Sequence, residues 1–157
     1  MKRIAIIGAG QSGLQLGLGL LANGYQVTLY SDRSAEEIRC GPVLSSQCMF
    51  DAALEVERAL GLNRWENECP PVEGIGFVVP DGFGGKVIDW AARLDNYALS
   101  VDQRVKIPGW MAEFEKRGGE LRIQEAGLNH LETCARSHDL VIVAAGKIGR
   151  ASCRERV

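Results

Sequence analysis

Short apolar runs alternate with amphipathic stretches along this chain of 157 residues. Residues 3–7 form an apolar run rich in β-branched side chains, which is typical of a strand buried in a parallel sheet. Residues 26–31 predict the second strand. Residues 11–23, between them, predict a helix closed by an Asn-Gly pair. Residues 140–146 form a further apolar run that ends in small side chains and predicts another parallel strand. The pattern therefore indicates an α/β fold with a Rossmann-like βαβ unit at its start.

The middle of the chain carries a different pattern. Residues 74–80 and 86–91 predict two strands around a turn at residues 81–85. Residues 94–102 suggest a further strand. Together these segments predict a small antiparallel sheet inserted into the α/β unit.

The remaining elements are predicted from caps and breakers. Ser46 is a candidate N-cap for a helix over residues 47–61, and Pro108 suits the first turn of a helix that ends at Arg117. The other expected segments are a mainly loop stretch over residues 33–46 with a weak helical signal around Ala35–Ile38, a strand over 121–123 and a helix over 127–136.

Gly8, Gly10 and Gly13 stand in Gly-x-Gly-x-x-Gly spacing between the first strand and the first helix. In a dinucleotide-binding βαβ unit the first glycine permits a tight turn and the second lets backbone approach a pyrophosphate. The third lets the helix pack closely on the strand. The phosphates would then meet the free N–H groups and the positive dipole end of the helix, where Gln11 and Ser12 lie. The motif favours dinucleotide binding over an ordinary glycine-rich turn.

Asp32 follows Gly13 by 19 residues, close to the spacing of about 20 expected for the acid that binds a ribose. Many such units place a carboxylate directly after the second strand, where this chain has Ser31. Since side chains alternate along a strand, the extra step could turn Asp32 away from the ribose. Asp32 is therefore either a ribose ligand or a solvated turn residue.

Composition narrows the class of protein. Apolar residues make up 46% of the chain, charged residues 24%, and the formal net charge is −2, so neither nucleic acid nor an anionic membrane is an expected partner. No apolar run reaches the roughly 18 residues of a membrane helix. Five cysteines without paired spacing favour a reducing cytoplasm, and the two histidines have no ligand cluster nearby, so no metal site is expected.

The end of the chain differs from the rest. Residues 148–157 match the translation of a common short-read sequencing adapter, with a natural basic tail as the alternative. We therefore exclude them from fold reasoning. Residues 1–147 are expected to be native, and the natural protein is expected to continue beyond about Lys147.

The order and spacing of several motifs across residues 2–147 resemble one family. The chain is similar to the N-terminal half of the oxygenase component of styrene/indole monooxygenases and, more broadly, to FAD-dependent aromatic hydroxylases. Four motifs carry this resemblance: the opening glycine turn, Leu29–Arg33, Val101–Pro108 and Asp139–Lys147. The resemblance implies that residues 1–147 are the N-terminal part of an FAD-binding domain.

The resemblance also implies a chemistry. In the two-component members a separate reductase supplies reduced flavin, which reacts with O2 to a flavin hydroperoxide. One oxygen atom then passes to an apolar alkene or aromatic such as styrene or indole. The protein would hold the flavin, exclude water and position the small apolar substrate.

Cofactor-binding residues follow from the resemblance position by position, whereas no catalytic residue can be named. The glycine turn with Gln11 and Ser12 would hold the pyrophosphate. The other candidate FAD contacts are Asp32, Arg33, Arg39, Gln103, Arg104 and Gly146.

Two alternatives stay open at this point. The same βαβ opening serves NAD(P)H-dependent oxidoreductases, although the inserted sheet argues against that class. The chain could also be a non-catalytic dinucleotide-binding module.

Overall fold

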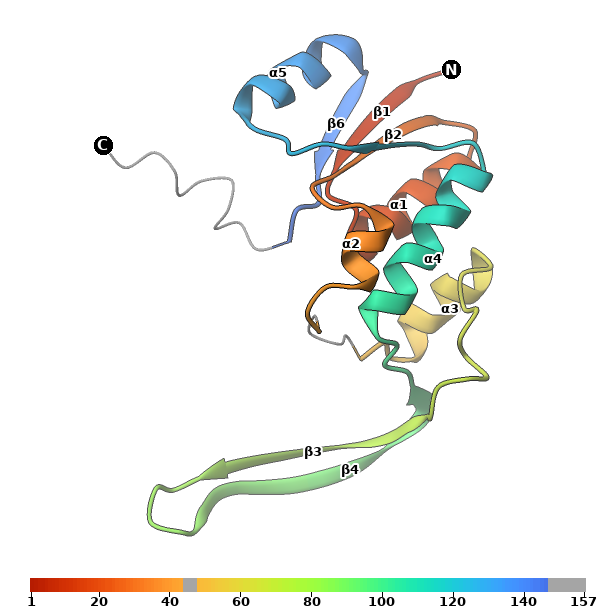
Figure 1. The fold of residues 1–157 in the computed structure, drawn as a ribbon. Coiled ribbons are helices and arrows are strands. Elements are labelled where there is room, and N and C mark those ends of the chain that lie inside the picture. The colour runs from red at the N-terminus through yellow and green to blue at the C-terminus, as the bar shows by residue number, and fades with distance from the viewer. Residues whose placement is uncertain (44–47, 147–157) are drawn as a thin grey trace, which may run out of the picture. The chain divides into compact units, whose positions relative to one another are not determined.

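The computed structural model describes residues 1–43 and 48–146 (Figure 1). The chain divides into two compact units, which are described in turn: Met1–Leu44 with Gln103–Val157, and Ser45–Asp102. The adapter-like residues 148–157 lie outside the described part of the chain.

The first unit is built on a parallel sheet in the order β5-β2-β1-β6. Every neighbouring pair in it is parallel, and Ile7 lies opposite both Tyr30 and Val143. The runs predicted as strands thus pair in parallel. Residues 3–7 and 26–31 are buried apart from their first residue, whereas residues 140–143 are partly exposed. The strands are β1 (Arg3–Ile7), β2 (Gln26–Ser31), β5 (Glu120–Ile123) and β6 (Leu140–Val143).

Helices cover both faces of this sheet. On one face α1 (Gln11–Ala22) packs against α4 (Gln103–Lys116), and α2 (Ala35–Arg39) packs against α4 as well. Figure 1 shows α5 (Leu128–Ser137) on the opposite side of the sheet. The first unit therefore has three layers, with the sheet in the middle.

The close approach of α1 to α4 depends on a glycine. A Cβ at Gly17 would lie 2.9 Å from the ring of Phe114. The side chains of Leu14, Leu18 and Phe114 are fully buried around this contact. On the other face Cys134 of α5 joins a smaller apolar cluster with β1 and β2.

One helix of this unit differs from the sequence expectation. The helix α4 begins at Gln103, so Pro108 lies inside it and not in its first turn. Burial of Lys106 and Ile107 continues the helix ahead of the proline, although Pro108 has no N–H to donate to the Arg104 carbonyl. The helical signal around Ala35–Ile38 is confirmed: α2 lies there and begins at a capping box between Ser34 and Glu37.

The second unit holds α3 (Asp51–Ala59) and a hairpin of β3 (Val72–Pro80) and β4 (Lys86–Ala98). The expectation of separate strands over 86–91 and 94–102 was wrong, because β4 runs unbroken from Lys86 to Ala98 and ends there. Ser46, the expected N-cap, lies outside the described residues. The start expected at residue 47 was wrong, because the helix begins at Asp51 with Phe50 in the cap position.

The hairpin turn is held by one carboxylate. Asp81 Oδ1 accepts from the backbone N–H groups of Phe83 (2.7 Å) and Gly85 (2.9 Å). Gly82 and Gly84 have φ of +82° and +94°, a region that favours glycine. The side chain of Phe83 stands 97% exposed at this turn.

Glu66 is the centre of a polar network that ties α3 to the rest of the second unit. Its Oε1 accepts from the Arg58 guanidinium and from the Tyr97 hydroxyl (2.7 Å), and its Oε2 accepts from Asn63 Nδ2 (2.6 Å). These donors, Arg58 first, lower the pKa of Glu66 from 4.5 to about 2. The network therefore stabilises the unit while Glu66 is ionised.

Glu66→Gln is expected to lower the free energy of unfolding of this unit by about 1–2 kcal/mol near neutral pH, because the hydrogen bonds to the Glu66 carboxylate lose their charged acceptor. The folded-state pKa lies below the usual value, so this stabilisation is complete above about pH 4.5 and is lost as the pH falls towards 2. Urea unfolding of both proteins near neutral pH and near pH 3 measures it. Glu68→Gln, at an exposed neighbour, is the control. A stability difference that does not change with pH would contradict the role of the Glu66 charge.

No helix among the described residues is long and apolar enough to cross a membrane.

Candidate dinucleotide-binding site

Gly8 connects the carboxyl end of β1 to the following turn and is confined by the chain itself. Its φ is +116°, and a Cβ there would lie 2.5 Å from the carbonyl oxygen of Ala144. Its N–H donates to the Tyr30 carbonyl at 2.9 Å. Gly8 thus allows the loop after β6 to lie directly against the glycine turn.

Gly13 is confined even more tightly. A Cβ at this position would come within 1.9 Å of the Gly8 carbonyl oxygen, which is backbone and cannot swing aside. The third glycine therefore brings the first turn of α1 into contact with the end of β1.

Gly10 has no such role within the chain. It is the N-cap of α1, with φ −76° and ψ −176°, and no atom lies within 4 Å of where its Cβ would be. No side chain caps the helix here, and its first turn carries no acidic residue. The space beside Gly10 and the positive end of the helix suit a phosphate group. Gln11 is buried and Ser12 exposed in the same turn.

Asp32 and Arg33 follow the carboxyl end of β2, at the same edge of the sheet as the glycine turn. The Asp32 side chain is 56% exposed, and its Oδ1 lies 3.7 Å from Arg33 Nε. Ser31 is buried, and its hydroxyl bonds to the backbone of Arg33. Ser31 is thus committed to the turn and leaves Asp32 as the exposed acid at this edge.

The other predicted contacts come from two places. Gly146 (φ +73°) follows β6, at the edge where β1 and β2 end. Arg39 lies on α2, where it pairs with Glu36 at 2.7 Å. Gln103 and Arg104 are the half-buried first residues of α4, against which α2 packs. The sheet edge therefore gathers the glycine turn with Asp32, Arg33 and Gly146. The remaining predicted contacts lie on two helices that pack together, α2 and α4.

A pocket of about 720 Å³ lies elsewhere in the first unit and contains none of the predicted site residues. It is formed by β2, β5 and α5, and its wall includes Thr28, Tyr30, His130 and Cys134. Burial, followed by a hydrogen bond with Cys134, raises the pKa of Tyr30. The polar groups of this pocket bond to one another: Thr28 donates to Glu120 at 3.0 Å.

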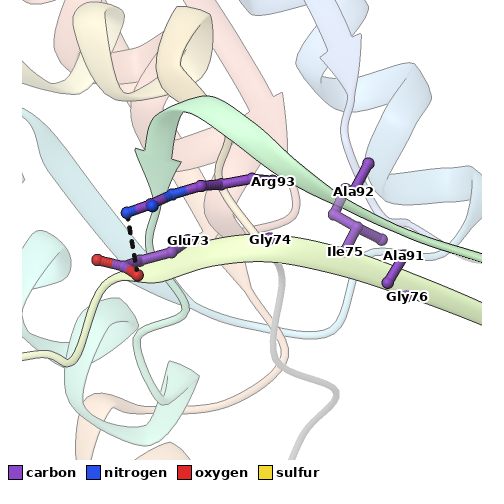
Figure 2. Close-up of a pocket in the computed structure, with 7 residues that line it drawn as sticks. All are labelled: Glu73, Gly74, Ile75, Gly76, Ala91, Ala92 and Arg93. Carbon is purple, nitrogen blue, oxygen red and sulfur yellow. Dashed lines mark ion pairs between the residues drawn. The ribbon is translucent and has the colours of Figure 1, made fainter.

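A shallower pocket lies on the hairpin of the second unit (Figure 2). Figure 2 shows Arg93 reaching across to Glu73, with 3.5 Å between Nη2 and Oε2. Beside this ion pair the wall consists mostly of small residues, namely Gly74, Gly76, Ala91 and Ala92. This is a depression in an exposed ribbon.

No group of three or more His, Cys, Asp and Glu side chains within residues 1–43 and 48–146 could hold a metal ion.

Sequence comparison gives two curated relatives. Over 146 residues, 93% of this chain, the sequence is 32% identical to styrene monooxygenase StyA of Pseudomonas fluorescens. Identity to the enzyme of the same name from Pseudomonas sp. is also 32% over 146 residues. The chain is a relative of the styrene monooxygenases. It spans about a third (34%) of the length of these styrene monooxygenases. No protein-family model matches it.

Solved structures support the fold. The flavin-dependent halogenase CmlS superposes with a TM-score of 0.61 at 18% identity, over 77% of this chain and 22% of the halogenase. A 2-methyl-3-hydroxypyridine-5-carboxylic acid oxygenase, as the Y270A mutant, gives 0.56 at 15% identity over 78% of this chain and 31% of the oxygenase. The chain thus has the Rossmann-like fold of FAD-binding flavoenzymes, with a small antiparallel sheet added to the parallel one.

Proposed function

We propose that this chain is the FAD-binding N-terminal part of a flavin-dependent monooxygenase that acts on an apolar alkene or aromatic such as styrene or indole. The observation that carries the proposal is the open space at Gly10, beside a helix start without a capping side chain. Gly8 and Gly13 are required by packing within the chain, whereas a Cβ at Gly10 would meet no atom of the chain within 4 Å. The styrene monooxygenase relatives favour a flavin over a nicotinamide cofactor.

The residues present fit the dinucleotide. The N–H groups at Gln11, Ser12 and Gly13 would hold the pyrophosphate at the N-terminus of α1, and Asp32 would accept from the adenosine ribose. Bound FAD would supply the oxygen chemistry. We further propose that a separate reductase delivers reduced FAD, with O2 and the apolar substrate as the other reactants. The further candidate contacts are Arg33, Arg39, Gln103, Arg104 and Gly146.

Gly10→Ala tests this proposal. Its methyl group would enter the space assigned to the pyrophosphate, so FAD affinity is expected to fall roughly tenfold or more while the free energy of unfolding changes by less than about 1 kcal/mol. FAD binding is measured by titration of flavin fluorescence, and stability by urea unfolding.

Gly127→Ala is the matched control. Gly127 is the N-cap of α5 with φ −91° and ψ −177°, has no side-chain cap, and has no atom within 4 Å of its Cβ position. This variant makes the same change at a helix start that is not assigned to FAD, and it should bind FAD normally. Failure of the unsubstituted chain to bind FAD, or normal binding by Gly10→Ala, would refute the proposed site.

A further inference from the structure

Two side-chain locks hold the segment that joins β2 to α2. In the first, the Ser31 hydroxyl donates to the Arg33 carbonyl at 2.6 Å and accepts from the Arg33 N–H at 3.3 Å. In the second, Ser34 caps α2: its hydroxyl accepts from the Glu37 N–H at 3.2 Å, and Glu37 accepts from the Ser34 N–H at 2.7 Å. Asp32 lies between them.

The first lock closes a turn around Asp32. Its two hydrogen bonds, one donated by the Ser31 hydroxyl and one by the Arg33 N–H, join Ser31 to the backbone of Arg33, and Asp32 is the single residue between them. A continuing strand would instead alternate its side chains and turn Asp32 to the face opposite Ser31. Since Ser31 is only 4% exposed, water cannot readily replace these bonds.

Asp32 lies where a ribose would be recognised. The glycine turn is bonded to the adjacent strand through the Gly8 N–H and the Tyr30 carbonyl, two residues before Asp32. The Asp32 carboxylate is more than half exposed and is free to accept from a ligand hydroxyl despite its long contact to Arg33.

We propose that Ser31 is a positioning residue, whose hydroxyl fixes the turn in which Asp32 accepts from the adenosine ribose of the dinucleotide. This inference rests on the proposed function, because it requires a ribose at this edge of the sheet. Ser31 does not touch the ligand. It acts through Asp32 and sets the preference of the site for a ribonucleotide over a deoxyribonucleotide.

The test compares ADP with 2′-deoxy-ADP, because ADP carries both the diphosphate and the adenosine ribose. The unsubstituted chain is expected to bind ADP roughly tenfold more tightly than 2′-deoxy-ADP, as for one hydrogen bond to a charged group. In Ser31→Ala this ratio should fall towards one. General loosening of the fold would weaken both ligands and leave their ratio unchanged.

Further variants separate positioning from stability. Ser31→Thr keeps the hydroxyl and should keep the ratio, whereas Asp32→Asn should lose it. Ser31→Cys keeps the size but weakens the hydrogen bonds, and serves if the alanine variant does not fold. Ser34→Ala removes the neighbouring lock and is the matched control: it should destabilise α2 and keep the ratio. Calorimetric titration gives affinities, and urea unfolding gives stability.

The outcomes distinguish this inference from the proposed function. An unsubstituted chain that binds neither ADP nor FAD refutes the proposed function. A chain that binds both, but whose preference for ADP persists in Ser31→Ala and Ser31→Cys, refutes the role of Ser31 alone. Equal binding of ADP and 2′-deoxy-ADP by the unsubstituted chain refutes the ribose contact of Asp32 and, with it, the role of Ser31.

Discussion

Gly13→Ala is expected to destabilise the first unit by about 3 kcal/mol or more, the upper range for overpacking. The new Cβ would lie 1.9 Å from the Gly8 carbonyl oxygen, so β1 and α1 would have to move apart. Gly8 cannot yield easily, because its own position packs against the backbone of Ala144. Urea unfolding followed by circular dichroism measures the loss.

Gly76→Ala provides the control for this substitution. A Cβ at Gly76, in β3, would make ordinary contacts of 3.7 and 3.8 Å, so stability should stay within about 0.5 kcal/mol. If Gly13→Ala unfolded at the same urea concentration as the original chain, the close contact between α1 and β1 would not be required. Gly13→Ala tests a glycine that the packing of the turn requires, whereas Gly10→Ala tests the glycine that leaves room for a ligand. The first should lower stability and the second should lower FAD affinity.

The hairpin of the second unit is expected to make the chain self-associate at micromolar concentrations. Phe77 lies opposite Trp90, and both side chains are about half exposed. Ile75 and Ile88 lie on the same face at alternate positions and are also exposed. An exposed apolar face on a ribbon with open edges favours pairing with other chains. Sedimentation velocity at increasing protein concentration measures this association.

Replacing Phe77 and Trp90 together by serine should shift the chain to monomer. Val78→Ser is the matched control, because Val78 is equally exposed but points to the other face of the same strand. A chain that sediments as a monomer throughout, or a Val78→Ser variant that abolishes association as completely as the double substitution, would contradict the role of this face.

The parallel sheet was predictable from the sequence, because β1 and β6 are apolar runs and the neighbours of β1 follow from the βαβ order. The antiparallel ribbon was less predictable from the sequence. Small and charged residues at 91–93 interrupt the apolar pattern, but β4 continues to Ala98 because it pairs with β3. In α4 the preference of proline for a first turn was overridden by burial of the residues ahead of it.

The candidate site was predictable only where it is local. Gly8, Gly10 and Gly13 act through backbone geometry a few residues apart, so their spacing was informative. The lock at Ser31 was missed: a serine just before the acid was the signal, but its hydroxyl could equally have faced water or a ligand. The pocket beside α5 could not be foreseen, because it combines strands and a helix far apart in the sequence.

The carboxylate of Asp81 has an effect that extends well beyond its own loop. Because side chains alternate along a strand, slippage of one strand by a single residue would put its glycine and alanine positions opposite the bulky positions of its partner. By fixing how many residues the loop contains, Asp81 keeps Phe77 opposite Trp90. One acidic side chain at the tip thus helps to select the alignment of the strands between Gly74 and Val79.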